Sequence, residues 1–279
     1  MTDFTFDLLR RWPALEAPEL VAVDATDRLL LDESAGALAS AAPGTVSVIG
    51  DRFGALTLGA VALHGASEVR THVDQLTGRR ALDANADRAG LAGTFTSHGL
   101  DAALLAGAEV VLIQLPRSLA ALDEIAGLVA EHAAPGVRVF AGGRIKHMTT
   151  GMNEVLSRYF TDVSAHLARQ KSRVLHASGP RADRTGSAWP AVARHDDLGL
   201  TVCAHGPAFA GTSIDLGTRV LLDAQRSMAP GARTALDLGC GTGVVAASLA
   251  LARPDLGVTA TDDSWAAVAS ARATALANG

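Results

Sequence analysis

One stretch of the chain, residues 234–278, constrains the fold more than any other. A short apolar run ends at Asp237, and the turn Gly239-Cys240-Gly241-Thr242-Gly243 follows at once. Residues 244–252 contain no Gly or Pro, which indicates a helix, and a second short apolar run ends at Asp262. A strand, a glycine turn, a helix, a strand and an acid in this order predict a parallel α/β unit that holds a nucleoside.

Each part of this pattern has a physical role. Glycines let the backbone approach a ligand closely and take dihedral angles that a Cβ disfavours. The helix N-terminus offers free amides and a partial positive charge, and the acid after the second strand can accept hydrogen bonds from ribose hydroxyls. A dinucleotide fingerprint has its third glycine one residue later, where this chain has Val244, so a nicotinamide cofactor is disfavoured. The alternative interpretation is an ordinary strand-turn-helix connection whose glycines bind no ligand.

Length and composition indicate a soluble protein with two domains. The chain has 279 residues, of which 48% are hydrophobic and 19% charged, enough for two apolar cores. No apolar run has the length of a membrane span, and the first residues lack the apolar segment of a signal peptide. Two cysteines cannot form a disulfide framework. We expect a cytoplasmic protein without a membrane partner.

Charge is distributed unevenly along the chain. The net charge is −5, but residues 138–184 hold nine basic residues and three acids. That segment therefore carries +6 and the remainder −11, which fits a local contact with RNA better than general nucleic-acid binding. An Arg-rich solvated surface explains the same count equally well. The candidate RNA-binding residues are Arg144, Lys146, Arg169, Lys171 and Arg173.

The same pattern of elements occurs about 190 residues earlier. Gly50 and Gly54 have the spacing of Gly239 and Gly243, and Asp74 is interpreted as the counterpart of Asp262. Arg52 stands at the position of Gly241, so the first copy is not expected to hold a cofactor unless that side chain turns outward. Strands and helices alternate from residue 45 to residue 160, and two further strands form a hairpin. The predicted fold is α/β: two Rossmann-like units with doubly wound, mostly parallel sheets, the first complete but degenerate and the second truncated.

Domain boundaries follow from composition. Residues 1–177 are predicted to form the degenerate unit, and residues 178–197, rich in Gly, Pro, Ser and charge, to form a linker. Residues 198–279 are predicted to be the N-terminal part of the cofactor-binding unit. With two central strands, that unit lacks cover for its free edge and apolar faces, so we expect it to self-associate, to be poorly ordered or to be completed by a separate segment.

Several segments together resemble one family, the two-domain bacterial ribosomal RNA guanine-N2 methyltransferases, in which a degenerate methyltransferase fold precedes an active one. The glycine turn itself is similar to motif I of class I methyltransferases, which use S-adenosylmethionine. The resemblance covers nearly the whole chain and looks closer to the large-subunit rRNA member. The segments that carry it are residues 49–56, 111–119, 141–143, 208–218, 237–243 and 262–268.

The resemblance implies a cofactor and its contacts. Asp237, Gly239, Cys240, Gly241 and Gly243 would lie against the methionine part of S-adenosylmethionine, and Asp262 would bind the ribose. The segment with Asp215, Gly217 and Thr218 would lie over the cofactor, although Asp215 could equally cap a helix. Ribosomal RNA is the implied partner and the N2 amine of a guanine the implied acceptor.

One departure from the family concerns catalysis. The family positions the target amine with an Asn-Pro-Pro-aromatic motif after the fourth strand of the active domain, and residues 1–279 contain no such sequence. The corresponding loop of the first unit, residues 115–118, lacks that chemistry. We therefore expect no catalytic residue in this chain, and we expect the chain alone to be inactive.

Other functions remain open from the residues. One is a class I methyltransferase that acts on a protein or a small molecule, and another is a non-catalytic RNA-binding module. The nine histidines show no metal-ligand spacing, so no metal site is expected. No Ser-His-Asp arrangement can be argued from the sequence.

Overall fold

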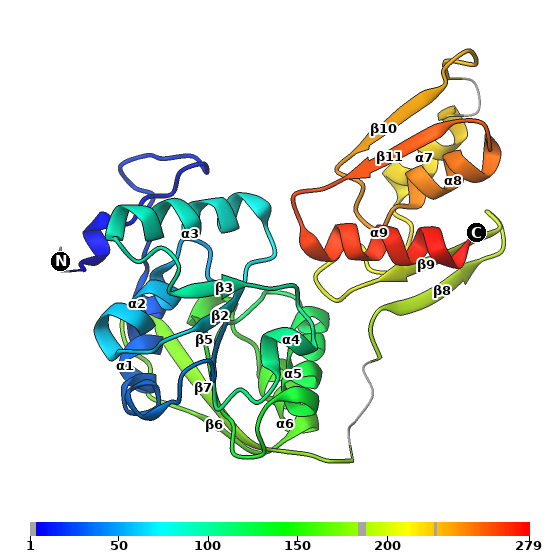
Figure 1. The fold of residues 1–279 in the computed structure, drawn as a ribbon. Helices are drawn as coiled ribbons and strands as arrows, with labels where there is room; N and C mark the ends of the chain where they lie inside the picture. Colours follow the sequence, from blue (N-terminus) through cyan, green and yellow to red (C-terminus); the bar gives the residue numbers. More distant parts are fainter. Residues whose placement is uncertain (1–3, 184–187, 226–227) are drawn as a thin grey trace. The chain divides into compact units, whose positions relative to one another are not determined.

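A computed structural model describes residues 4–183, 188–225 and 228–279, in two compact units that divide after Gly186. The first unit is built on a seven-stranded sheet with the order β3-β2-β1-β4-β5-β7-β6 (Figure 1). The strands β1 to β5 run parallel, and β7 and β6 add an antiparallel pair at one edge. This confirms the doubly wound sheet that the sequence predicts. The strands are β1 Val46–Ile49, β2 Val69–His72, β3 Phe95–Ser97, β4 Val110–Gln114, β5 Arg138–Arg144, β6 Phe160–Ala165 and β7 Ser172–Pro180.

Helices connect the parallel strands and cover the sheet. Helix α1 packs on α2, β5 and β7, while α5 packs on α6 and α4. The central strands β1 and β4 are buried on both faces, and residues 110–113 of β4 accordingly form a continuous apolar run. The helical segments are η1 Phe6–Leu8, α1 Ala25–Ser40, α2 Ala55–His64, α3 Leu76–Ala89, α4 Ala102–Leu105, α5 Leu119–His132, η2 Ile145–His147 and α6 Thr150–Tyr159.

The second unit contains two small sheets and three helices in its described residues. Strands β8 Ala191–His195 and β9 Leu200–Ala204 form an antiparallel pair, and β10 Thr234–Leu238 and β11 Gly257–Thr261 form a parallel pair. The helices are α7 Leu216–Gln225, α8 Val244–Ala252 and α9 Trp265–Ala277. Helix α9 lies on β9, and a small core forms between β9, α7 and α8.

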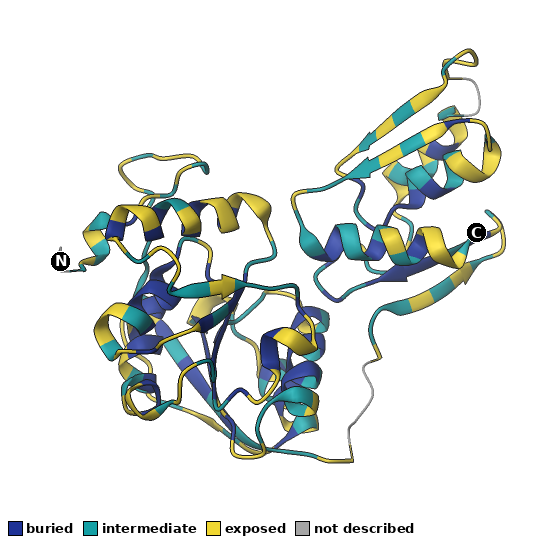
Figure 2. Ribbon diagram, viewed as in Figure 1, coloured by how far each residue is buried: buried dark blue, intermediate teal, exposed yellow. Residues whose placement is uncertain are grey.

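The outer strand pair of this unit is poorly covered. Leu236 is 64% exposed and Leu238 82% exposed, in contrast to the buried β1 of the first unit (Figure 2). These exposures agree with the expected lack of cover over the two central strands. The self-association that the sequence analysis derives from it stays a prediction.

The stretch predicted as a linker contains regular structure. Strand β7 continues to Pro180, where it pairs with Phe160, and β8 occupies residues 191–195. The prediction of a linker over 178–197 is therefore wrong at both ends, because Ala-Val-Ala-Arg-His pairs with β9 along its whole length. Residues 184–187 of that stretch lie outside the described residues.

Among the described residues, no helix combines the length and apolarity that crossing a lipid bilayer demands.

Candidate cofactor site and basic surface

The glycine turn between β10 and α8 has the backbone that the sequence predicts. Gly239, Gly241 and Gly243 have φ angles of 78°, 52° and 78°, in the left-handed region that favours glycine. A Cβ at Gly239 or Gly241 would meet no described atom within 4 Å, whereas one at Gly243 would lie 2.8 Å from Cα of Ala271. The outer face of the turn is therefore open backbone, and its last glycine is needed for close packing on α9.

Two carboxylates flank the turn. Asp237 accepts a hydrogen bond from the Ala246 amide in the first turn of α8 (3.1 Å). Asp262 accepts from the Gly241 amide (3.0 Å) and the Ser264 amide (2.9 Å), so it ties the turn to the start of α9. Burial raises the pKa of Asp237, and Asp262 adds to the shift. The structure thus brings both predicted acids and all three glycines into one small site.

Cys240 lies inside the turn with its thiol buried. Its amide and that of Gly239 both donate to the Thr261 carbonyl, at 2.9 and 2.8 Å. Burial, followed by the charges of Asp262 and Asp237, raises the pKa of Cys240 to about 11. The thiol therefore stays protonated at neutral pH and packs as a small apolar group.

The segment at the start of α7 forms a helix cap. Asp215 accepts hydrogen bonds from the amides of Gly217 (2.9 Å) and Thr218 (3.2 Å) and from the Thr218 hydroxyl (2.5 Å). These bonds lower the pKa of the exposed Asp215, with the Thr218 hydroxyl as the largest cause. The cap is the alternative that the sequence analysis left open, and a contact of this segment with a cofactor stays a prediction.

The corresponding turn of the first unit, residues 50–54, makes the same backbone hydrogen bond to the neighbouring strand as the turn of the second unit. The Gly50 amide donates to the His72 carbonyl (2.9 Å), as Gly239 does to Thr261, and Ile49 pairs with His72 as Leu238 pairs with Thr261. The two copies are therefore related by a shift of 189 residues. This confirms the internal repeat and fixes its alignment.

The alignment corrects one sequence interpretation. The shift places Val73, and not Asp74, opposite Asp262, and it places Val48 opposite Asp237. The first unit thus has valine where the second has each of its two acids. It lacks the carboxylates that a nucleoside cofactor needs, which is a stronger reason for degeneracy than Arg52, whose side chain is exposed.

Asp51 is a residue whose role sequence reasoning missed. Its carboxylate accepts from the amides of Gly54 (2.9 Å) and Thr57 (2.7 Å) at the start of α2 and is 1% exposed. Burial raises the pKa of Asp51 in spite of these bonds. The first unit therefore satisfies the amides at its helix N-terminus with a side chain of its own.

The predicted basic residues gather where β5 ends and β7 begins. Arg144 lies opposite Ser172 and Gly143 opposite Arg173, and the Ile145 amide donates to the Lys171 carbonyl (2.9 Å). Lys146 and Lys171 are exposed, and Arg144 and Arg173 are half-buried. Arg169, in the turn of the hairpin, forms an ion pair with Asp32 (2.5 Å).

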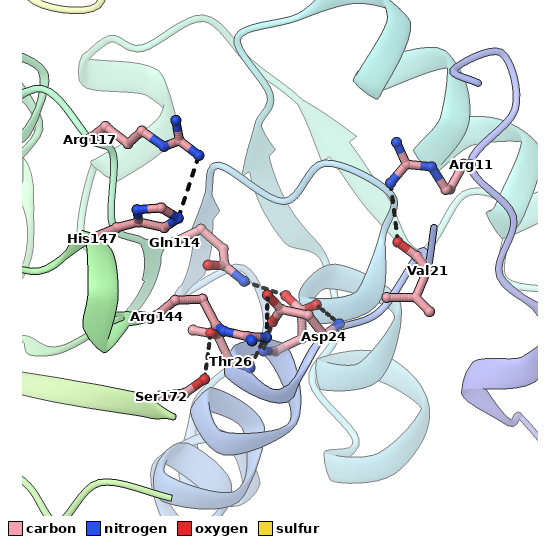
Figure 3. A network of polar contacts seen from close by, with 10 residues as sticks. Arg11, Val21, Asp24, Thr26, Gln114, Arg117, Arg144, His147 and Ser172 are labelled. Carbon is pink, nitrogen blue, oxygen red and sulfur yellow. Dashed lines mark hydrogen bonds and ion pairs between the residues drawn. The ribbon is translucent and has the colours of Figure 1, made fainter. Parts of the chain in front are cut away.

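Two further side chains extend this surface. Arg117 follows β4, and its guanidinium lies 3.5 Å from Nε2 of His147 (Figure 3). Reduced hydration, and then the charges of Arg117, Lys146 and Arg144, lower the pKa of His147. The sequence count of basic residues began at residue 138 and so missed Arg117, which only the sheet order β1-β4-β5 brings to this place. We call Arg117, Arg144, Lys146, His147, Lys171 and Arg173 the basic surface.

A polar network supports the basic surface from the start of α1 (Figure 3). Arg144 forms an ion pair with Asp24 (3.8 Å), the capping residue of α1, and Thr26 shares a hydrogen bond with Ser172 (2.9 Å). Gln114 of β4 donates to Asp27. Burial is the largest cause that raises the pKa of Asp27, to about 7.

Comparison with known proteins gives two family matches that together span nearly the whole chain. Residues 1–181 match the RLMG N-terminal domain, and residues 199–279 match the methyltransferase small domain. The chain is 36% identical over 274 residues to the ribosomal RNA large subunit methyltransferase G of Pseudomonas entomophila and 34% identical over 270 residues to that of Pseudomonas aeruginosa. In both cases the match covers 95% of this chain and 70% of the relative.

A solved structure shares the fold at low identity. It is a 16S rRNA N2 methyltransferase of T. thermophilus in complex with AdoMet and guanosine, with a TM-score of 0.65 and 20% identity. The match covers 91% of this chain and 67% of that one. At this identity the likeness concerns the arrangement of helices and strands.

Proposed function

Because the chain belongs to the ribosomal RNA large subunit methyltransferase G family, we propose that the protein transfers a methyl group from S-adenosylmethionine to the exocyclic N2 amine of a guanine in ribosomal RNA. The observation that carries the proposal is the open glycine turn between Asp237 and Asp262 in a chain of this family. The name of the relatives supports the RNA substrate, and the guanosine complex of the T. thermophilus enzyme supports the base.

The second unit would hold the cofactor. The open backbone at Gly239 and Gly241 leaves room for a ligand. Cys240 donates its amide to the Thr261 carbonyl and Gly243 packs against Ala271, so these two residues hold the turn in place. Asp237 can accept from the ammonium of the methionine part and Asp262 from the ribose hydroxyls. The bound cofactor would supply an electrophilic methyl group.

Catalysis by such an enzyme rests mainly on positioning. The guanine N2 nitrogen attacks the methyl carbon directly, and its proton leaves after the transfer, so no strong base is required. In this proposal the residues of the present chain bind and orient the cofactor. None of them is assigned to the amine, because residues 1–279 contain no Asn-Pro-Pro sequence.

The first unit would bind the RNA through its basic surface. Exposed cations next to half-buried arginines are suited to binding phosphates. Each phosphate that such a cation neutralises releases counterions, and this release favours binding. Arg169 is a weaker member of the predicted set, since its guanidinium is engaged by Asp32. Arg144 is likewise paired, at 3.8 Å, with Asp24, so Lys146 and Lys171 are the freest cations of the set.

The decisive experiment uses the product of the intact gene with labelled S-adenosylmethionine. Naked large-subunit rRNA, naked small-subunit rRNA, assembled subunits, ribosomal proteins and total small molecules are offered as acceptors, and modified nucleosides are identified by mass spectrometry. We expect N2-methylguanosine in large-subunit rRNA. Label in protein or in a small molecule instead would support the alternative acceptor class and refute the proposal.

The cofactor half-site is tested with a matched pair of variants. Asp262→Ala should weaken S-adenosylhomocysteine binding at least tenfold, because about two charge-assisted hydrogen bonds are lost. Asp74→Ala should leave binding unchanged, because the first unit is not expected to hold the cofactor. Equal losses of S-adenosylhomocysteine affinity in the two variants would show that the first unit also contributes to cofactor binding and that the internal repeat has been interpreted wrongly.

RNA binding is tested by charge reversal at exposed positions. Lys146→Glu with Lys171→Glu should weaken rRNA binding and lower the slope of log affinity against log salt by about 2. Arg79→Glu with Arg80→Glu, which changes the same charge on exposed positions of α3, is the control. Equal affinities of both double variants would leave the basic surface without a role in RNA binding.

A further inference from the structure

Three side chains that are remote in sequence converge between α1 and the β6–β7 hairpin. Nδ1 of His166 lies 2.9 Å from Oε2 of Glu33, and Nε2 of His176 lies 3.5 Å from the same oxygen. His166 follows β6, His176 is in β7 opposite Ser164, and Glu33 is on α1. Side chains two residues apart on a strand share a face, so both imidazoles point toward the helix.

The ligand atoms have the spacing of a metal site. One nitrogen of each histidine and one carboxylate oxygen of Glu33 all lie within 4.8 Å of one another. Zn²⁺ bonds of about 2.0–2.1 Å at tetrahedral angles place neighbouring ligand atoms roughly 3.4 Å apart. The observed separations bracket this value, so the three ligand atoms lie close enough to share one ion once the rings are reoriented.

The shielding of the cluster also suits a cation. Nε2 of His176 is screened from solvent, and its nearest acidic partner is the Glu33 carboxylate at 3.5 Å, a distance that is long for a hydrogen bond. The three side chains are 24–39% exposed, which leaves a path for an ion and room for a water molecule as a fourth ligand.

One side-chain movement is needed. The two imidazole rings are stacked, with centroids 3.6 Å apart and planes inclined by 16°. An ion bonded to both rings lies near the plane of each, so one ring turns about its Cβ–Cγ bond on binding. That torsion is soft in histidine. His176 packs edge-on against Phe140 at 4.6 Å, so His166 is the ring with more freedom.

We infer that Glu33, His166 and His176 form a zinc site of the two-histidine, one-carboxylate type that fastens the β6–β7 hairpin to α1. Imidazole and carboxylate ligands at this spacing favour Zn²⁺ over Mg²⁺ or Ca²⁺, which prefer six or more oxygen ligands. The hairpin carries Arg169, Lys171 and Arg173, so the ion would stabilise the part of the chain that presents these cations. No metal site was expected from the sequence, because Glu33 and His166 are 133 residues apart along the chain and the two histidines are 10 residues apart.

The test is equilibrium binding of Zn²⁺ to the full chain, stripped of metal with a chelator. Competition with a chromophoric chelator gives the stoichiometry and affinity, and Co²⁺ absorption reports tetrahedral coordination. We expect one ion per chain, bound at least tenfold more weakly by His176→Gln and by Glu33→Gln. His132→Gln is the matched control, because His132 lies 3.9 Å from Glu131 with a similar exposure but belongs to no three-ligand cluster among the described residues.

The outcomes separate clearly. Zinc should also raise the midpoint of thermal unfolding of the wild type and of His132→Gln, and not that of the two site variants. The inference is overturned if the wild type binds no stoichiometric Zn²⁺ at concentrations of about 100 μM. It is overturned equally if His176→Gln and Glu33→Gln, both verified as folded by circular dichroism, bind as tightly as the wild type, because the ion would then sit elsewhere, for instance on a cysteine.

Discussion

Alanine substitutions at two glycines of the same turn should impair different properties, one of them mainly cofactor binding and the other mainly folding. Gly241 has a φ of 52°, and a methyl group there would project into open space on the outer face of the turn. Gly243 has a φ of 78°, and a methyl group there would lie 2.8 Å from both Cα and Cβ of Ala271. The first substitution therefore obstructs the face that would receive the cofactor, and the second obstructs the packing of α8 on α9.

The expected magnitudes follow from these contacts. A left-handed backbone costs an alanine about 1–2 kcal/mol relative to glycine, so Gly241→Ala should destabilise the second unit by that amount. Gly243→Ala adds an overpacking cost of about 1–3 kcal/mol to a similar strain, because α9 must move. Gly241→Ala should also weaken S-adenosylhomocysteine binding at least tenfold, since its methyl group stands on the open face.

The measurement combines calorimetric titration of S-adenosylhomocysteine with urea unfolding. A Trp12→Phe background leaves tryptophans only at positions 189 and 265, so fluorescence reports on the second unit. Gly199→Ala is the matched control, with a φ of 62° and no described atom within 4 Å of its Cβ position. It should reproduce the strain of Gly241→Ala and bind the ligand normally. Unchanged ligand affinity in a folded Gly241→Ala chain would refute the assignment of the cofactor to this turn.

Three further predictions follow from the structure. The folded-state pKa of Asp27, about 7, lies above the ordinary 3.8, so the folded state binds the extra proton between these values and stability should fall as pH rises from about 4 to 7. Asp27→Asn should reduce this slope in urea unfolding without abolishing it, because burial also raises the pKa of Asp51 and of Asp237. The variant should gain at most about 4 kcal/mol at pH 8, whereas an unchanged slope would contradict the buried acid. The pKa of Cys240, about 11 against 9.0, predicts a thiolate fraction roughly 100-fold smaller at neutral pH, and alkylation by iodoacetamide roughly tenfold slower than for a free cysteine thiol, because a more basic thiolate is more nucleophilic; a rate equal to that of free cysteine in mass spectrometry would contradict it. Asn278 accepts from the Thr201 amide (2.9 Å) and donates to its carbonyl (2.7 Å), so Asn278→Ala should cost about 1–3 kcal/mol in the unfolding of the second unit. A decrease in the free energy of unfolding smaller than the experimental error would mean that water replaces the hydrogen bonds of the Asn278 side-chain amide.

The sequence predicts well what depends on local patterns. The helix over 119–132 belongs to the predicted alternation of strands and helices, and its start follows from local sequence because Ser118 caps it. The glycine turns are found as predicted, because their φ angles leave little choice of residue. The predicted bounds of the linker were wrong because residues 191–195, with a single β-branched residue, form a strand only when β9 lies beside them.

Tertiary placement was harder to predict. From the sequence alone, Asp74 is interpreted as the counterpart of Asp262. Only the pairing of β1 with β2 shows that Val73 is the residue at the equivalent position. Asp51 gives no signal of a buried cap in the sequence, because an acid in a glycine turn is more often exposed. The approach of Glu33 to the two histidines depends on how α1 crosses the sheet, and no spacing along the chain encodes it.

The burial of Asp51 has a consequence for stoichiometry. An α/β unit of this kind binds an anionic or polar ligand because the amides at the N-terminus of its helix need hydrogen-bond acceptors. In the first unit the buried Asp51 accepts from two of these amides, whereas Asp237 accepts from one in the second unit. Valines also stand in the first unit at the positions of the two acids that would bind the ligand. A molecule with two copies of one architecture should therefore saturate with a single equivalent of nucleoside.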